Sequence, residues 1–557
     1  MWVADLQNGN YRNPVLYADY SDPDAIRVGE DYFMVASSFS NSPALPILHS
    51  KDLVNWKVIN YCLKHIPEFR YNNPIHGCGV WAPSIRYHEG TYYVCFPMPD
   101  EGIYMTTTKD PWGEWSEPVN IRPGAGWIDP CPFWDDDGKA YLVAGVARSR
   151  IGYKSVLHIV RMQPDGMGIF GDEVKIFDGN ENDQVTIEGP KMYKRNGYYY
   201  IFAPAGGVKT GWQTILRSNN PFGPYEYKVV LRQGDSPVNG PHQGAWVDTV
   251  TGEDWFLHFQ DVYAAGRITH LQPMHWENDW PIIGVNKDGN DYGEPVMEYR
   301  KPDIGKTAEE LADKTKYPIC EPDTTDEFET KNMMLQWQWN ANYDDNWFET
   351  KTDVYGNKSE NGSYIKLNAV PTTYARPVGD YRNLLLQKWP APEFTCVTKM
   401  SLNGLKDGDY AGIVSLGVDY AALGIAKRDG AYFIRTVIGK QNFDCEAVYT
   451  QENVDDKVIA SDRFADDTQT IYLRYTVKRT GLKETSEMKL SVKNVPVEEA
   501  TLEISFDGRN YENAVSYTAK AGRWVGVKNG MFVSHDNTVK NEETGFITVD
   551  YIRYSEI

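Results

Sequence analysis

An internal repeat of about 50 residues is the feature that most constrains the fold of this chain. Five segments share one design, in which a short strand and a tight turn containing Gly or Asp precede an aromatic or β-branched strand. The segments are SDPDAIRVGEDYFMVASS, WAPSIRYHEGTYYVCFP, IDPCPFWDDDGKAYLVAG, IEGPKMYKRNGYYYIFAP and HQGAWVDTVTGEDWFLHF. Their head positions are 22, 81, 129, 188 and 242, so the copies are spaced by 59, 48, 59 and 54 residues. Copies of this length, each holding about four short strands, predict a five-bladed β-propeller over residues 1–300.

The propeller geometry places the five head residues on one ring around the central channel. The heads are Asp22, Trp81, Asp129, Glu188 and His242. Three carboxylates that converge on a partly dry pocket repel one another, so that one stays protonated while the others stay ionised. A protonated acid facing an ionised base is what glycoside hydrolysis requires, and neighbouring aromatic rings suit the apolar face of a sugar.

Composition limits the class of partner and the compartment. The 557 residues carry a net charge of -21, which excludes a surface built to bind a polyanion such as nucleic acid. No run of 18 apolar residues predicts a membrane span. The N-terminus lacks a basic and apolar leader, so we expect a cytoplasmic protein, or a secreted one whose signal peptide precedes this numbering. The seven cysteines are scattered without a CxxC pair, which favours free buried thiols.

The repeat ends near residue 300, and a different β pattern follows it. Residues 301–324 are polar and turn-rich and read as a linker over the propeller. From residue 325 to 557, strands of period two recur every 10–20 residues, which predicts a two-sheet β-sandwich of the jelly-roll or lectin-like kind. The predicted fold class is therefore all-β, with a propeller followed by a sandwich.

The ordered set of blade motifs resembles glycoside hydrolase family 43. The segments NPVLYADYSDPDAIRV, WAPSIRYHEGTYYV, GWIDPCPFWDDDGKAYL, IEGPKMYKRNGYYYIFAPAGG, HQGAWVDT and GRITHLQPMHW match its signatures in order. The resemblance implies that Asp22 is the general base, that Asp129 raises the pKa of the acid and orients it, and that Glu188 is the general acid. Asp24 lies close to Asp22 in SDPD, and we favour Asp22 because its proline neighbour matches the other heads.

The same resemblance extends to the sugar site and to metals. It implies that Trp81 and Phe39 wall the sugar site and that Arg267, in GRITHL, reaches toward the sugar. It also implies a central calcium near His242, held largely through waters. Asp326 and Asp550, near the two ends of the sandwich, are candidates for a second calcium. WDDDGKA lacks the spacing of a calcium loop and is better read as a hairpin turn. No organic cofactor is expected.

The expected activity is that of an inverting exo-glycosidase. By resemblance, it would release terminal xylose or arabinofuranose from xylan and arabinoxylan oligosaccharides, as a β-xylosidase, an α-L-arabinofuranosidase or both. Two alternatives share the fold. A retaining fructosidase would use its first-blade aspartate as a nucleophile, usually in an NDPNG-like setting, whereas this chain has SDPDA. A non-catalytic sugar-binding propeller would lack one of the three carboxylates, and all three are present.

Overall fold

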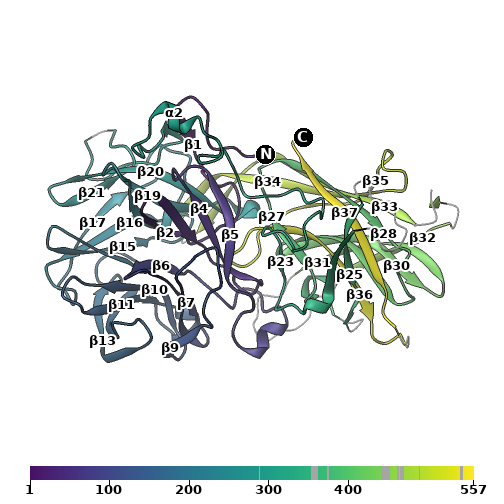
Figure 1. The fold of residues 1–557 in the computed structure, drawn as a ribbon, viewed down its shortest axis with the longest axis horizontal. Helices are drawn as coiled ribbons and strands as arrows, with labels where there is room; N and C mark the ends of the chain where they lie inside the picture. The colour runs from purple at the N-terminus through teal and green to yellow at the C-terminus, as the bar shows by residue number, and fades with distance from the viewer. Residues whose placement is uncertain are drawn as a thin grey trace.

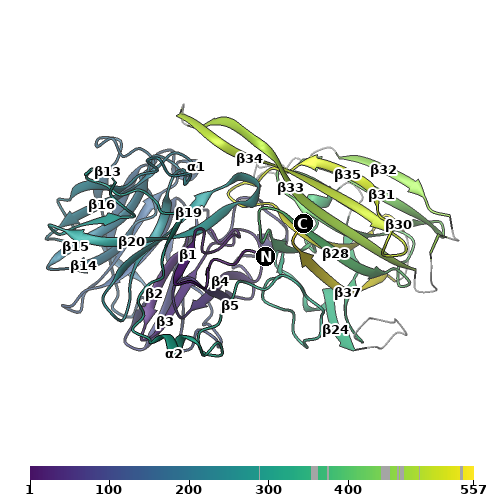
Figure 2. The ribbon, with the colours of Figure 1, turned by 90° about the horizontal axis from the view of Figure 1, so that it is seen from above.

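The computed structural model describes two all-β domains that lie side by side (Figure 1). The described residues are 1–287, 289–352, 362–372, 376–440, 452–460, 463–464, 469–487, 490–539 and 543–557. Both chain termini lie near the junction of the two domains in Figures 1 and 2. Within the described residues, neither α-helix has the length or the apolar character needed to cross a membrane.

Residues 24–283 form five four-stranded antiparallel sheets, each with its strands in sequence order. This confirms the predicted five-bladed propeller. Blade 1 comprises β2 (Asp24–Val28), β3 (Asp31–Val35), β4 (Ala44–Ser50) and β5 (Trp56–Leu63). Blade 2 comprises β6 (Ser84–His88), β7 (Thr91–Met98), β8 (Gly102–Thr108) and β9 (Val119–Pro123). Blade 3 comprises β10 (Trp127–Trp134), β11 (Ala140–Val146), β12 (Val156–Met162) and β13 (Ile169–Asp178), with α1 (Arg148–Ile151) between the second and third strands.

The last two blades complete the ring. Blade 4 comprises β14 (Lys191–Arg195), β15 (Tyr198–Ala205), β16 (Trp212–Ser218) and β17 (Glu226–Leu231). Blade 5 comprises β18 (His242–Asp248), β19 (Asp254–Asp261), β20 (Arg267–Glu277) and β21 (Trp280–Ile283). Each seam between neighbouring blades is filled by a cluster of buried apolar side chains; the seam between blades 5 and 1 contains Trp255, Leu257 and Trp56. Burial along every seam is what holds the blades at a common axis.

The ends of the propeller segment are tied to each other. β1 (Asn10–Arg12) pairs with β22 (Glu298–Arg300), and Leu16 forms a bridge with Thr269 of blade 5. The connecting segment that follows contains α2 (Ala308–Leu311), whose N-terminus has a capping box formed by Thr307 and Glu310. This segment runs along blade 1, where the Cys320 amide donates to Asn55 Oδ1.

The C-terminal domain is a sandwich of two sheets, as predicted. One sheet has the order β23-β27-β36-β29-β30-β31-β32, with β26 paired in parallel to β36; the other has the order β24-β25-β37-β28-β33-β34-β35. The first sheet comprises β23 (Gln338–Trp339), β26 (Val370–Thr372), β27 (Leu385–Lys388), β29 (Asp409–Leu416), β30 (Asp419–Arg428), β31 (Ala431–Lys440), β32 (Asn453–Val458) and β36 (Lys528–Asp536). The second comprises β24 (Phe348–Thr352), β25 (Ser363–Asn368), β28 (Phe394–Ser401), β33 (Thr470–Glu487), β34 (Leu490–Ser505), β35 (Glu512–Thr518) and β37 (Phe546–Ser555).

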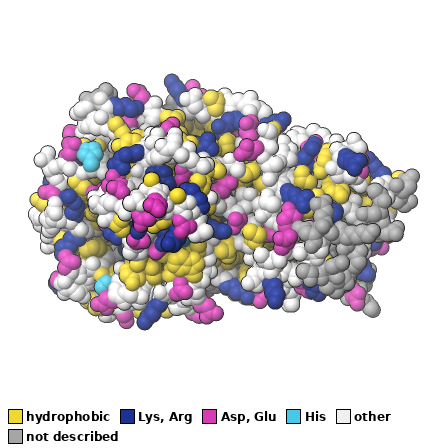
Figure 3. Space-filling view, turned by 45° about the horizontal axis from the view of Figure 1, so that its top comes forward, with side chains coloured by type: hydrophobic (Ala, Val, Ile, Leu, Met, Phe, Trp, Pro, Cys, Tyr) yellow, Lys and Arg dark blue, Asp and Glu magenta, His cyan; other side chains and the backbone are white. Residues whose placement is uncertain are grey.

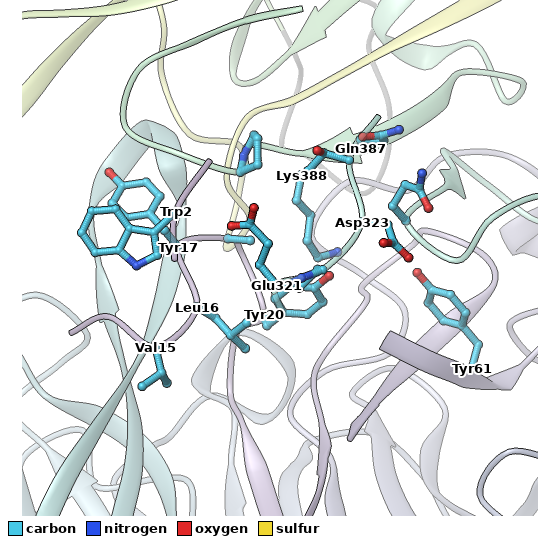
Figure 4. A pocket seen from close by; sticks show the side chains of 15 residues that line it. Trp2, Val15, Leu16, Tyr17, Tyr20, Tyr61, Glu321, Asp323, Gln387 and Lys388 are labelled. Carbon is cyan, nitrogen blue, oxygen red and sulfur yellow. The ribbon is translucent and has the colours of Figure 1, made fainter. Parts of the chain in front are cut away.

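The domain junction buries polar as well as apolar groups. A small cavity of about 30 Å³ lies between the segment at residues 15–20, the connecting segment at 321–324 and the end of β27 (Figure 4). The Lys388 ammonium enters it from β27, lies 5.2 Å from the Tyr20 ring centroid and donates to Gln338 Oε1 at 2.7 Å. Burial and the nearby charge of Lys528 lower the pKa of Lys388 to about 7. The interface therefore contains a lysine that is only partly charged near neutral pH.

The described cysteines behave as expected, since all six are free and five of them are buried. Cys445 lies outside the described residues. The surface seen in Figure 3 interleaves acidic and basic side chains over both domains instead of gathering one sign into a single patch. That face therefore carries no broad basic surface of the kind that a polyanion needs.

Candidate active site

The three candidate carboxylates lie where each inner strand begins. Asp22 lies two residues before β2, Glu188 lies three residues before β14, and Asp129 interrupts the pairing of β10 with β11 at a bulge between Ile128 and Cys131. Asp22 and Asp129 have φ angles of 56° and 54°, in the left-handed region that aspartate tolerates better than bulky residues. Such strain concentrates at functional sites, because the surrounding fold must hold it in place.

These carboxylates line one cavity of about 80 Å³ together with the predicted sugar-binding residues. The lining residues are Asp22, Phe39, Trp81, Ala82, Ile128, Asp129, Glu188, Val208, Gln243, Arg267 and Trp524. Residues separated by up to 245 positions along the propeller sequence thus meet at one point of its face. The arrangement provides three ionisable oxygen groups, an arginine and aromatic walls in a space suited to a small ligand.

Asp22 is held by hydrogen bonds on both oxygens. Its Oδ1 accepts from Arg267 Nη1 at 2.9 Å, and its Oδ2 accepts from Ser37 Oγ at 2.8 Å. The Asp22 side chain is 3% exposed and that of Arg267 is 7% exposed. A buried pair of this kind fixes the orientation of the carboxylate toward the cavity.

Asp24, the neighbouring alternative, does not line this cavity. Its Oδ2 accepts from Arg86 Nη1 at 2.6 Å and from the Ile85 amide at 2.8 Å, which ties blade 1 to blade 2. The side chain is fully buried. Its contacts are those of a structural ion pair, so the geometry favours Asp22 for a role at the cavity.

Asp129 carries a strongly perturbed pKa. Burial, followed by the charges of Glu188 and Asp22, raises the pKa of Asp129 from 3.8 to about 8. Its Oδ2 accepts from the Gly189 amide at 2.8 Å, which links blade 3 to the turn beside Glu188. The site therefore keeps a proton at Asp129 near neutral pH, as mutual repulsion of carboxylates in a dry pocket favours.

Glu188 is oriented by a histidine from the next blade. His242 Nε2 lies 2.8 Å from Glu188 Oε1, and the imidazole is completely buried. The Glu188 side chain keeps 28% of its surface exposed, in contrast to the two aspartates. The Glu188 amide donates to the Pro204 carbonyl, and Gly189 takes a φ of 58° next to it. A Cβ at Gly189 would lie 2.9 Å from Gln243, so this turn needs glycine.

The predicted aromatic residues form one wall of the cavity. The ring centroids of Phe39 and Trp81 are 6.2 Å apart, and the Trp81 indole donates to the Gly77 carbonyl at 3.1 Å. The Arg267 guanidinium lies 4.7 Å from the Phe259 ring centroid and 5.6 Å from that of Trp524. Arg267 is thereby clamped between the fifth blade and the sandwich, with its fork toward Asp22.

Sequence reasoning missed Trp524 and Gln243. Trp524 comes from the loop between β35 and β36 of the sandwich, so the blade repeat contains no trace of it. It has a φ of 67°, which is strained for a bulky side chain. Gln243 directly follows a predicted head, and its amide lies 3.5 Å from Asp129 Oδ2. The one feature of the sequence that could have predicted a role for Gln243 is its position next to His242.

Among the described residues, the predicted metal-site residues do not form a direct set of calcium ligands. His242 Nε2 contacts Glu188, and its buried Nδ1 has no hydrogen-bond partner. Asp326 accepts hydrogen bonds from the Phe328 amide and the Trp337 indole, and Asp550 forms an ion pair with Lys399 at 2.7 Å. Within the described ranges, no three His, Cys, Asp or Glu residues are grouped as metal ligands. Calcium takes 6–8 oxygen ligands, so an ion near His242 would be held largely through waters, which is the arrangement that the family resemblance implies.

Comparison with known proteins agrees with this geometry. The family model for "Glycosyl hydrolases family 43" matches residues 11–281, and that for the "Beta xylosidase C-terminal Concanavalin A-like domain" matches residues 325–555. A "Putative beta-xylosidase" of Xylanibacter ruminicola is 40% identical over 432 residues, which cover 77% of this chain and 75% of the relative. The chain belongs to glycoside hydrolase family 43.

Further matches extend over the whole of this family-43 enzyme. A "Beta-xylosidase" of Formosa agariphila is 30% identical over 602 residues, covering 99% of this chain and 91% of the relative. The solved structure titled "Bifunctional GH43-CE Bacteroides eggerthii" superposes with a TM-score of 0.75 at 26% identity, over 98% of this chain and 64% of that longer chain. Both the propeller and the sandwich are therefore shared with relatives, and the protein is a glycoside hydrolase.

Proposed function

We propose that this enzyme is an inverting exo-glycosidase that releases terminal xylose, arabinofuranose or both from xylan and arabinoxylan oligosaccharides. The observation that carries the proposal is the cavity in which Asp22, Asp129 and Glu188 meet, which the sandwich residue Trp524 borders. A cavity walled by aromatic rings suits one terminal sugar, with the bond to be cleaved at its mouth. The names of two relatives support xylosides as substrates, and further relatives named arabinofuranosidase or xylosidase/arabinosidase support arabinofuranosides beside them.

The proposed reaction is a single displacement. Glu188 donates its proton to the glycosidic oxygen as the bond to the anomeric carbon breaks. Asp22 accepts a proton from a water molecule, whose oxygen forms the new bond on the opposite face of the sugar ring. The leaving sugar departs as an alcohol, and the released sugar has the inverted anomeric configuration.

The surrounding groups support these roles. Ser37 and Arg267 hold the Asp22 oxygens, so the base keeps its position while water approaches. His242 orients the Glu188 carboxyl group. Asp129 lies beside Glu188, accepts a hydrogen bond from the Gly189 amide and repels the neighbouring carboxylates, so the site keeps a proton close to the glycosidic oxygen. Trp81 and Phe39 present ring faces to the sugar.

The test compares two substrates whose leaving groups differ. We expect Glu188→Gln to lower kcat on xylobiose by about 10³-fold, because the sugar alcohol needs protonation, and to lower it far less on p-nitrophenyl xyloside. Asp22→Asn should abolish turnover of both substrates, because both need the water to be activated. Wild-type turnover of xylobiose by Glu188→Gln would contradict the acid assignment.

The stereochemistry provides an independent check. Proton NMR of the first product formed from a β-xyloside should show α-xylose. Initial release of β-xylose would instead indicate a retaining mechanism and remove the proposed role of Asp22 as a base.

A further inference from the structure

A second and larger groove continues from the catalytic cavity along the junction of the two domains. Its volume is about 450 Å³, against about 80 Å³ for the catalytic cavity. Val208, Arg267 and Trp524 line both spaces, so the groove begins at the mouth of the cavity. One wall comes from blades 4 and 5, and the other from the β33–β34 hairpin and the loop before β36. Figure 2 shows this hairpin extending from the sandwich toward the propeller.

The loop that follows β15 connects the groove to the surroundings of the proposed acid. Val208 lies in the loop that follows β15, and the Gly206 amide of this loop donates to the Val185 carbonyl. The Glu188 amide donates to Pro204, at the end of the same strand. The leaving sugar is bonded to the oxygen that Glu188 protonates, so the remainder of the substrate continues from the acid toward Val208. The groove is therefore the space available to the leaving portion of the substrate.

Its lining is basic, although the chain as a whole is strongly acidic. Five basic residues and two acidic residues line the groove, whereas the whole chain has a net charge of -21. The basic residues are Lys209, Arg267, Lys483, Lys520 and Arg523. Burial raises the pKa of both acidic residues, Asp261 and Glu498. Basic side chains therefore outnumber acidic ones along the groove, in contrast to the chain as a whole.

Two of these lysines are available to a ligand. The Lys209 ammonium lies 4.4 Å from the ring centroid of Tyr263, which holds it at the groove wall. The Lys483 side chain is exposed on β33. Among the described residues, neither lysine forms an ion pair with a carboxylate, whereas Lys520 is paired with Asp419. A site for a neutral sugar would be walled mainly by aromatic rings, and this groove has only Tyr263 and Trp524.

We propose that this groove binds the leaving portion of a substrate that bears a carboxylate, namely a xylo-oligosaccharide substituted with a uronic acid. The inference rests on the proposed function and specifies its substrate class. Lys209 and Lys483 contact the uronate from opposite walls, while Trp524 separates the terminal sugar from the substituted part. The enzyme accordingly prefers acidic over neutral oligosaccharides of the same length.

The test measures kcat/KM on two oligosaccharides of equal length, one neutral and one with a uronic acid on its leaving portion. The wild type should favour the acidic substrate at low ionic strength, and the preference should shrink as salt rises from about 0.05 to 0.5 M. Lys209→Met and Lys483→Met should each lower the acidic-to-neutral ratio by about 3- to 10-fold. The control Lys175→Met, on the outer strand of blade 3, should leave the ratio unchanged.

An equal ratio in the wild type and both lysine variants would overturn the inference. Calorimetric binding of the acidic oligosaccharide to the Glu188→Gln protein separates this failure from a failure of the proposed function. If Lys209→Met weakens this binding but the wild type cleaves no pentoside, the proposed ligand of the groove stands and the proposed activity is refuted. If the wild type cleaves p-nitrophenyl xyloside but shows no preference for the acidic oligosaccharide, the proposed activity stands and the proposed ligand of the groove is refuted.

Discussion

Replacing Asp129 with Asn should stabilise the protein while it inactivates it. Burial and two neighbouring carboxylates raise the pKa of Asp129 from 3.8 to about 8, so the folded state binds a proton that the unfolded chain has released over this range. Because this group binds its proton more tightly in the folded state, the free energy of unfolding of the protein falls as pH rises from 3.8 to 8. The wild type therefore carries a penalty that is absent near pH 4 and complete above pH 8. An asparagine has no proton to release, so the variant does not carry this penalty.

The size of the effect follows from the shift. Each unit of pKa shift corresponds to about 1.4 kcal/mol of stability. The full shift is an upper bound on the gain in stability, because the asparagine amide must itself be buried and the charges of Asp22 and Glu188 remain. We expect a net gain of about 2 kcal/mol at pH 8.5, or a rise in the Tm of the propeller of about 4 °C, and no gain at pH 4. The kcat on xylobiose should fall by at least about 10²-fold, because Glu188 loses the neighbouring carboxyl group with which it exchanges the proton of the site.

Thermal unfolding between pH 4 and 9, followed by tryptophan fluorescence, measures the difference between wild type and variant. Asp135→Asn is a matched control of opposite sign. Burial raises the pKa of Asp135, but hydrogen bonds from Lys194 and Tyr199 outweigh burial and lower it, so this variant should lose stability above pH 4. If Asp129→Asn has the wild-type dependence of Tm on pH, the carboxylates do not share a proton and the reasoning is refuted.

Two further predictions concern the sandwich loop and metal. Trp524→Ala should raise KM for p-nitrophenyl xyloside about 10-fold, because it removes an aromatic wall of the cavity. Trp524→Gly should raise KM equally but have a higher Tm than the alanine variant, because glycine adopts the φ of 67° without strain. An unchanged KM in both variants would show that Trp524 does not contact the substrate. Dialysis against EDTA should leave kcat/KM within about two-fold of its starting value and leave Tm unchanged, because no three His, Cys, Asp or Glu side chains are grouped as metal ligands among the described residues. A loss of activity that added calcium restores would show that a calcium site exists.

The blade repeat was sufficient to predict the propeller and the convergence of its head residues. Equivalent positions in a ring of similar units must lie at similar distances from the axis, so residues as far apart as Asp22 and Glu188 could be placed together without any contact information. The same reasoning put His242 on the ring but could not assign its partner, because the choice between Glu188 and a metal depends on side-chain direction and on a bulge between His242 and Gly244. The periodicity of the sequence predicts neither the side-chain direction nor the bulge.

Contacts between the domains were beyond such reasoning, because no local pattern links residues that are separated by half the chain or more. Trp524 and the basic groove arise where the sandwich meets the propeller, and the residues on each side carry only ordinary loop and strand signals. The sandwich itself was predictable from its strands of period two. Its docking position was not, since that position depends on two surfaces that fit each other.

That docking makes the sandwich part of the active site. The buried Asp19 carboxylate accepts a hydrogen bond from the Arg267 amide on one oxygen and from the Gly526 amide on the other, both at 2.9 Å. The Val527 amide donates to the Ala264 carbonyl of the same region. A Cβ at Gly526 would lie 2.9 Å from the Ala265 backbone, so the loop can approach blade 5 only through a glycine. The strand start that positions Arg267 against Asp22 is therefore fixed by the same contacts that hold the loop of Trp524, and a propeller without its sandwich would lose both the wall of the cavity and the anchor of the arginine.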